Sequence, residues 1–306
     1  MLRSMYSGIS GMKNFQTKMD VVGNNISNVN TYGFKKGRTT FKDMVSQSVA
    51  GASAPTNTRG GTNPKQVGLG SQIAAIDTLH TTGSLQTTGR TLDLAISGDG
   101  FFQVGQSASG TSAFDSIQYT RAGNFYMDSN GMLVNSDGFY LVGFADNTTT
   151  PNDSTSYADP DTITGTPNFP ATGNPTLTDA AYKPIKIPND ATSVSIGQDG
   201  TVTFTDANGE LRWAGQLIIA KFSNPEGMSK SGSNYFSETP ASGTPALNVA
   251  GSGGNGDVIA GSLEMSNVDL SEEFTEMIVA QRGFQANTRI ITTSDEILQE
   301  LMSMKR

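Results

Sequence analysis

The sequence predicts an α+β protein whose two ends are helical and whose middle consists of short strands. Two observations predict this class: an apolar repeat of helical period at each end, and alternating segments separated by turn residues between them. The composition agrees, because hydrophobic residues make up 35% and charged residues only 16% of the chain, below the usual shares of globular proteins. Such a polar chain favours many small β units over one deep core.

Apolar residues near the start of the chain recur at steps of three or four, so they share one side of a helix. They are Leu2, Met5, Ile9, Met12, Phe15, Met19, Val22 and Ile26. Every second member of this series repeats after seven residues, from Met5 to Ile26. Several asparagines and then Gly33 end the pattern, which predicts a helical segment over residues 1–30.

A matching stripe predicts a second helical segment over residues 268–306. Its members are Phe274, Met277, Ile278, Phe284, Ile291, Leu298 and Leu301. Ser271 is the expected N-cap, and Glu272 and Glu273 suit the positive end of the helix dipole. Each helix taken alone could simply pack on a domain. Heptads at both extremes also fit ends that pair as a coiled coil and meet neighbouring subunits.

Between the ends, the pattern predicts β-rich core domains, hairpin-based or barrel-like, over residues 71–145 and 185–267. Asn130-Gly131 and Asn208-Gly209 are strong hairpin signals, and residues 251–256 resemble a hairpin tip. Residues 31–70 are expected to form a linker or extended connection. Residues 146–184, rich in Thr, Pro, Asp and Asn, are expected to be a small outlying insert or a flexible loop.

The composition also excludes several functions. The net charge of −8 argues against nucleic-acid binding, which needs a basic surface. No apolar run approaches the roughly 18 residues of a membrane span, and no cleavable secretory signal is expected. The chain has no cysteine and a single histidine, so we expect no catalytic, cofactor-binding or metal-binding residues. Ser10 and Lys13 match a Ser-x-x-Lys motif, but they lie inside the first helical pattern.

The sequences of several segments resemble those of flagellar rod and hook proteins. Residues 20–34 resemble their N-terminal signature, and residues 88–102 and 119–125 resemble their shared core. Residues 266–270 and 277–287 resemble their C-terminal signature. The residues that carry the resemblance include Gly23, Asn24, Asn25, Asn28, Gly33, Phe34, Gly100, Phe101, Phe102, Asn267, Gln281 and Arg282.

Within this family, residues 31–35, 41–44 and 278–287 look more like hook sequences, whereas residues 187–200 are similar to a distal rod protein. The resemblance implies a structural subunit, not an enzyme, that forms a helical homopolymer with helices inside and β domains outside. A hook subunit would transmit motor torque, and its lumen would conduct exported subunits.

Implied partners are further copies of the chain, the distal rod, the hook cap and hook–filament junction proteins, and the flagellar type III export apparatus. The implied location is extracellular, in the flagellum, after export without a cleaved signal. An enzyme would need two carboxylates facing one cleft. An extracellular adhesin would bind a ligand as a monomer and would usually enter by a signal peptide.

Overall fold

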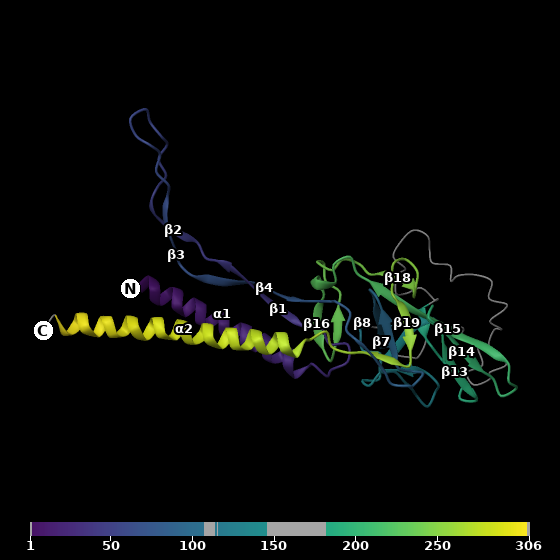
Figure 1. Ribbon diagram of the computed structural model, residues 1–306. Helices are drawn as coiled ribbons and strands as arrows, with labels where there is room; N and C mark the ends of the chain where they lie inside the picture. The colour runs from purple at the N-terminus through teal and green to yellow at the C-terminus, as the bar shows by residue number, and fades with distance from the viewer. Residues whose placement is uncertain (1, 107–113, 115, 146–181, 305–306) are drawn as a thin grey trace. The chain divides into compact units, whose positions relative to one another are not determined.

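The computed structural model describes residues 2–106, 114, 116–145 and 182–304 (Figure 1). The chain divides into two compact units. Unit 1 holds residues 1–29, 36–79 and 268–306, and unit 2 holds residues 30–35 and 80–267. Helices lie at the two ends of the chain and strands lie between them, so the predicted α+β class is confirmed.

Unit 1 contains the two long helices. Helix α1 spans Leu2–Ser27 and helix α2 spans Leu270–Ser303, and Figure 1 shows them side by side. The N-cap of α2 is Asp269, whose side chain accepts hydrogen bonds from the backbone N–H groups of Ser271 and Glu272. The prediction that Ser271 is the cap is wrong, because this carboxylate already pairs with the first free N–H groups of the helix.

Four strands accompany the helices in unit 1. They are β1 (Gly37–Asp43), β2 (Ser46–Ala50), β3 (Lys65–Gly68) and β4 (Ser71–Thr78). β1 pairs antiparallel with β4, from Gly37 opposite Thr78 to Asp43 opposite Ser71, and β2 pairs with β3. Residues 31–70, expected to form a linker or extended connection, thus contain three strands that are each paired with another strand. Every side chain of β2 and β3 is exposed, so the alternation that marks a half-buried strand is absent from the sequence.

Unit 2 is built from short strands that surround one longer strand, β15. The strands are β5 (Leu85–Thr87), β6 (Leu94–Ser97), β7 (Phe101–Gln106), β8 (Ser116–Thr120), β9 (Tyr126–Met127), β10 (Leu133–Val134), β11 (Tyr140–Ala145), β12 (Tyr182–Pro184), β13 (Ser193–Ile196), β14 (Thr201–Thr205), β15 (Leu211–Lys221), β16 (Ser229–Gly232), β17 (Tyr235–Ser237), β18 (Ala246–Val249), β19 (Asp257–Ala260) and β20 (Ser262–Glu264).

The main sheet of unit 2 follows the order β13-β14-β15-β11-β7-β8-β17-β16. Alternate residues of β7 point to opposite faces, so Phe102 enters one apolar cluster and Phe101 enters the other. Among the described strands, the ends of this path, β13 and β16, do not pair with each other. β15 also pairs with β7, its neighbour but one along this path. The barrel-like closure expected from the sequence is therefore not confirmed among the described strands.

Two of the predicted turns are confirmed and one is wrong. The Asn130-Gly131 turn joins β9 to β10, with Leu133 opposite Met127, and Asn208-Gly209 joins β14 to β15. Both glycines have a positive φ, 79° and 82°, which explains why glycine stands there. The hairpin tip expected at residues 251–256 is wrong, because β18 pairs with β15 whereas β19 pairs with β6.

Most of the expected insert, residues 146–181, lies outside the described residues. Its last three residues form β12, which pairs with β11 from Val142 opposite Pro184 to Phe144 opposite Tyr182. Tyr182 is 2% exposed. Residues 182–184 therefore belong to the sheet and not to an outlying insert, because their backbone groups complete its ladder.

Candidate assembly interface

Helices α1 and α2 approach each other closely at points where glycine stands on one of them. A methyl group placed on Gly283 of α2 would lie 2.6 Å from the ring of Phe15 on α1. One placed on Gly11 of α1 would lie 2.8 Å from the side-chain nitrogen of Asn287 on α2. Atoms do not pack at such distances, so the missing side chains are what admit the opposite helix.

One amide of the predicted signature connects three segments of unit 1. Asn25 donates hydrogen bonds to the carbonyl oxygen of Gly37 at 2.9 Å and to Oε2 of Glu273 at 3.1 Å. It also accepts one from the backbone N–H of Gly37 at 2.9 Å. Both side chains are buried, with Asn25 2% and Glu273 5% exposed. The amide therefore binds α1, the start of β1 and the first turn of α2 together.

Two ion pairs flank this buried contact. Lys36 lies 2.7 Å from Glu272, and Lys18 pairs with Glu276. The glutamates are 57% and 44% exposed, so each pair contributes little on its own. The acidic residues at the start of α2 thus have partners on α1 and at the residue that precedes β1, in addition to their favourable position in the helix dipole.

The heptad positions of the predicted stripes face the contact between the helices. Val22 is buried, and the following residues are half-buried: Met5, Met12, Phe15, Met19, Ile26, Met277, Phe284, Ile291 and Leu298. Ile9, Phe274, Ile278 and Leu301 are instead 46%, 50%, 51% and 49% exposed. The side chain of Leu2 lies outside the described residues. The predicted set therefore contains both covered and uncovered positions.

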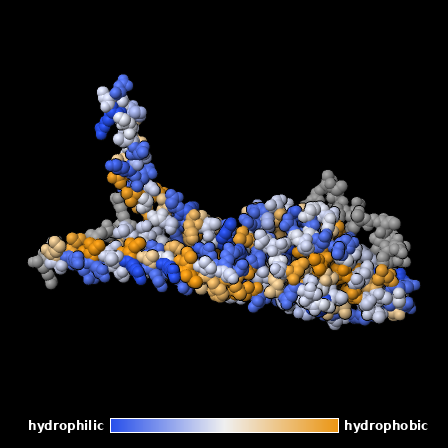
Figure 2. All heavy atoms as spheres, in the orientation of Figure 1, coloured by the Kyte–Doolittle hydropathy of each residue, from blue (hydrophilic) through white to orange (hydrophobic). Residues whose placement is uncertain are grey.

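A second apolar stripe lies along α2, and of its members only Leu301 belongs to the stripe predicted from the sequence. Its members are Val279, Ile290, Ile297 and Leu301 on the helix, and Met304 at its C-cap. Their spacing of 11, 7, 4 and 3 residues places them on one side of the helix, on a flank of the face that contacts α1. Figure 2 shows apolar side chains along the part of α2 nearest the C-terminus. The signal was present in the sequence, but the stronger heptad of Met277 to Leu298 obscured it.

The signature glycines of unit 2 stand where backbones meet. Gly33 has a φ of +69°, and a methyl group there would lie 2.6 Å from the backbone nitrogen of Ala122. Gly100 has a φ of +131°, and a methyl group there would overlap Ile219. Only glycine combines a positive φ with the lack of a side chain, and both are needed at these two positions.

The other signature residues divide between packing, local bonding and exposure. Phe34, Phe101 and Phe102 are buried, and Asn267 donates to the hydroxyl of Thr81 at 2.9 Å. Asn28 donates to the carbonyl oxygen of Asn24 near the end of α1 at 2.9 Å. A methyl group on Gly23 would meet nothing within 4 Å, and Gln281 and Arg282 are exposed. The structure therefore explains some of these residues within the chain and leaves others facing outwards.

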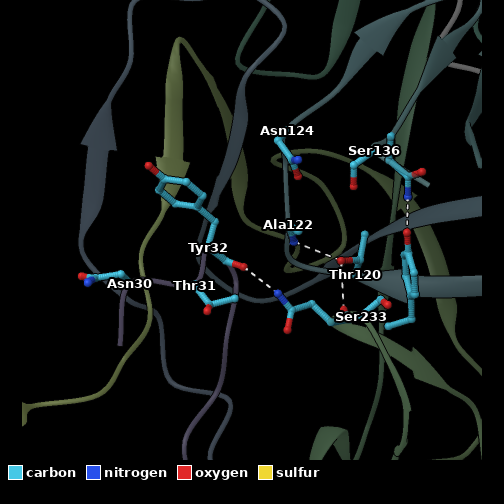
Figure 3. A pocket seen from close by; sticks show the side chains of 11 residues that line it. Asn30, Thr31, Tyr32, Thr120, Ala122, Asn124, Ser136 and Ser233 are labelled. Carbon is cyan, nitrogen blue, oxygen red and sulfur yellow. Dashed lines mark hydrogen bonds between the residues drawn. The ribbon is translucent and has the colours of Figure 1, made fainter. Parts of the chain in front are cut away.

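Unit 2 also contains a polar pocket of about 230 Å³ (Figure 3). Its lining consists of amide, hydroxyl and small side chains, without a charged residue. It comprises Asn30, Thr31, Tyr32, Thr120, Ala122, Asn124, Asn135, Ser136, Ser233, Asn234 and Tyr235. The side chains of Asn124 and Ser136 point into the space, and Asn234 donates to the carbonyl oxygen of Tyr32 at 3.0 Å. Nothing in this lining resembles an acid–base pair or an activated nucleophile.

The described residues contain no group of three or more acidic or histidine side chains placed to hold a metal ion. Across the same residues, no helix has both the length and the apolar character needed to cross a membrane. The feature that stands out is thus a surface of unit 1 that could be covered by another protein chain.

Comparisons with known proteins identify the family. Three family models match: "Flagella basal body rod protein" over residues 5–35, "Flagellar hook protein FlgE/F/G D1 domain" over residues 95–204, and "Flagellar basal body rod FlgEFG protein C-terminal" over residues 259–304. The chain is 53% identical to the flagellar basal-body rod protein FlgG of Bacillus subtilis, with all of both chains covered. The chain belongs to the flagellar rod and hook protein family.

Relatives in this family carry both rod and hook names. The flagellar hook protein FlgE of Borreliella burgdorferi is 34% identical, again with both chains fully covered. The flagellar basal-body rod protein FlgG of the same organism is 36% identical with the same coverage. The family consists of structural flagellar proteins and is not an enzyme family.

Proposed function

We propose that this chain polymerises with copies of itself into a helical tube of the flagellum. The observation that carries the proposal is the second stripe of α2, whose members are 43–81% exposed. Burying apolar surface contributes about 25 cal/mol per Å², so an exposed apolar stripe of this kind favours association with another chain. The partner chain would be a second copy, since members of this family are components of flagellar rods and hooks.

In the assembled tube, α1 and α2 would pair as a coiled coil and form the inner layer. The assembly domain would comprise residues 1–30 and 268–306, and the β-rich core of residues 71–145 and 185–267 would lie outside it. The half-buried heptads support the pairing, because residues of this spacing keep one seam facing the partner helix. Residues 31–70 would connect the layers, and residues 146–181 would form the outlying part.

The segment of the tube that we favour is the hook. Residues 31–35, 41–44 and 278–287 resemble hook sequences, and hook proteins of Borreliella burgdorferi and Treponema pallidum match along their full length at 34% and 31% identity. As a hook subunit, the chain would form a flexible joint that transmits motor torque to the filament. Its lumen would conduct other exported subunits.

The distal rod is the second candidate. It is favoured by the 53% identity to a protein named as the rod protein FlgG, with equal coverage of both chains. A rod subunit would form the same kind of tube, but in a straight segment below the hook.

The partners that follow from either candidate are the distal rod, the hook cap and the hook–filament junction proteins. The flagellar type III export apparatus would deliver the chain to an extracellular position without a cleaved signal. These assignments rest on membership of the family.

Electron microscopy of isolated hook–basal bodies, labelled with gold-conjugated antibody to unit 2, separates the candidates. Label on the curved segment is the expected result. Label confined to the straight rod would show that the chain is a distal rod subunit and not a hook subunit. Label on neither segment would contradict the proposal. Matched particles from a strain lacking the protein provide the control for antibody specificity.

A further inference from the structure

Three segments of unit 2 lie next to the points where the chain passes between the two units. They are residues 30–35, residues 80–84 and residues 264–267, because the chain changes units after positions 29, 35, 79 and 267. Any force carried from unit 1 to unit 2 along the chain must enter through these segments. The contacts that hold them together lie entirely within unit 2.

Glu264 contacts the other two crossing segments directly. Its Oε1 atom accepts hydrogen bonds from Nζ of Lys35 at 2.5 Å and from the backbone N–H of Gly83 at 2.9 Å. Its carbonyl oxygen accepts one from the backbone N–H of Gly33 at 2.8 Å. The side chains of Glu264 and Lys35 are both fully buried. One residue thus joins all three segments.

Two further contacts close the arrangement. Lys35 also donates to the carbonyl oxygen of Thr81 at 2.7 Å, and Asn267 donates to the hydroxyl of the same Thr81 at 2.9 Å. Oε2 of Glu264 accepts from Arg121 at 3.2 Å, and Arg121 in turn donates to the carbonyl oxygen of Gly98 at 2.7 Å. Arg121 therefore attaches the joined segments to the body of the sheet.

The charges of Lys35, Glu264 and Arg121 make it costly to separate one of these side chains from the other two. One buried carboxylate pairs with two buried cations, so removal of Glu264 would leave neither Lys35 nor Arg121 with a buried counter-ion. Removal of Lys35 instead leaves a balanced pair of Glu264 and Arg121. Unpaired buried charge is strongly destabilising, whereas a balanced buried pair is much less so. The two positions should therefore respond differently to substitution.

We propose that Glu264 is a positioning residue that clamps the three crossing segments into one body, so that they open together and not one at a time. The clamp itself follows from contacts within unit 2. Its use, which is to pass load from the assembly helices to the β domain, rests on the proposed function.

Hydrogen exchange of the isolated full-length chain, followed by mass spectrometry of peptides, tests the clamp. Glu264→Gln should raise the exchange rate at least about tenfold in all three segments. Lys35→Met should do so in residues 30–35 and at the neighbouring Thr81 contact, while residues 264–267 stay protected by the remaining pair. Loosening by Glu264→Gln that is confined to residues 264–267 would overturn the proposal.

A matched control separates the clamp from a general loss of stability. Val104→Ala opens a cavity in the core of unit 2, where Val104 is fully buried, and lowers the melting temperature without touching the cluster. Its exchange should rise across the sheet and not selectively in the three segments. If Glu264→Gln fails to fold, Glu264→Gln combined with Lys35→Met provides a second test. Because one cation is then removed with the carboxylate, the double variant should be more stable than Glu264→Gln alone.

Tubes assembled from Lys35→Met protein test the use of the clamp. Tubes that form at the normal concentration but bend more easily in electron micrographs are expected. Tubes of unchanged stiffness would restrict the contact of Lys35 with Glu264 to a local role and would overturn its proposed use in passing load. Failure of the wild-type chain to form tubes at all would count against the proposed function and would leave the exchange result standing.

Discussion

Single polar side chains decide several contacts in this protein, and Asn25 is the simplest case. Its amide both donates to and accepts from Gly37, and it donates to the buried carboxylate of Glu273. An asparagine fits here because one side chain supplies a donor and an acceptor within the same plane. Among the asparagines of the N-terminal signature, Asn25 is buried and hydrogen-bonded, whereas the neighbouring Asn24 is exposed.

Replacing Asn25 by alanine should lower the free energy of unfolding by about 1–3 kcal/mol, because it leaves Glu273 and the Gly37 backbone with unpaired buried groups. Urea unfolding of the full chain measures the change. Asn24→Ala is the matched control and should stay within about 0.5 kcal/mol of the wild type. Equal effects of the two substitutions would show that the buried contact contributes no special stability.

His80 lies between two aromatic rings, with ring centroids 5.4 Å from Phe101 and 5.1 Å from Phe236. Neither of its ring nitrogens has a hydrogen-bond partner among the described residues. Burial, followed by nearby positive charges, lowers the pKa of His80 from 6.5 to about 3. These charges belong to Lys35, Arg121 and Lys230. The ring is therefore neutral at physiological pH.

The shifted pKa of His80 predicts a loss of stability in acid. Between pH 6.5 and about 3, His80 is protonated in the unfolded chain but stays neutral in the folded chain. The free energy of unfolding therefore falls as the pH drops through that window. The contribution should reach on the order of 2–3 kcal/mol by about pH 4.5. Urea unfolding at about pH 7.5 and about pH 4.5 measures it. His80→Gln should lose less stability than the wild type over this interval, and an equal loss would contradict the assignment.

At the scale of elements, helix pairing depends on where side chains are missing. Gly283 faces the ring of Phe15, whereas Gly23 faces open space. Glycine costs about 1 kcal/mol relative to alanine inside a helix. At Gly283 the close approach of Phe15 explains why glycine is present despite this cost. At Gly23 no contact in the described part of the chain explains it.

The two glycines should therefore respond in opposite ways. Gly283→Val should force α1 and α2 apart and reduce the helix signal in circular dichroism, since the new side chain would overlap Phe15. Gly23→Ala should leave the contact intact and raise the stability of α1 by up to about 1 kcal/mol. Thermal unfolding monitored by circular dichroism compares them. An unchanged helix signal in Gly283→Val would show that the helices do not depend on this approach.

The success of sequence-based prediction also differed between elements. The period from Met277 to Leu298 was enough to place α2, because a helix repeats its pattern locally. The pairing of β2 with β3 was missed, since the exposed side chains of these strands give no alternation. The pairing of β1 with β4 was missed because the two strands lie far apart in the chain. The contact of Lys35 with Glu264 joins residues 229 positions apart, and no local pattern reports such a contact. The local periodicity of apolar residues was therefore enough to predict the helices. The buried polar contacts could be found only from the three-dimensional structure.

At the scale of the whole molecule, the exposed stripe of α2 should matter for assembly and not for folding. Ile290, Ile297 and Leu301 are 43%, 47% and 49% exposed, so replacing all three by glutamine removes little packing within the chain. The free energy of unfolding of the monomer should therefore change by less than about 1 kcal/mol.

Assembly of the same triple variant should fail, or should need at least about tenfold more protein, because the apolar surface that a second copy would bury is gone. Sedimentation and negative-stain electron microscopy measure the concentration at which tubes appear. The control is a triple variant of the polar face of the same helix, with serine in place of Gln285, Thr292 and Gln299, which should assemble at the wild-type concentration. If the glutamine variant formed tubes at that concentration, this stripe would not be the surface through which copies of the chain meet.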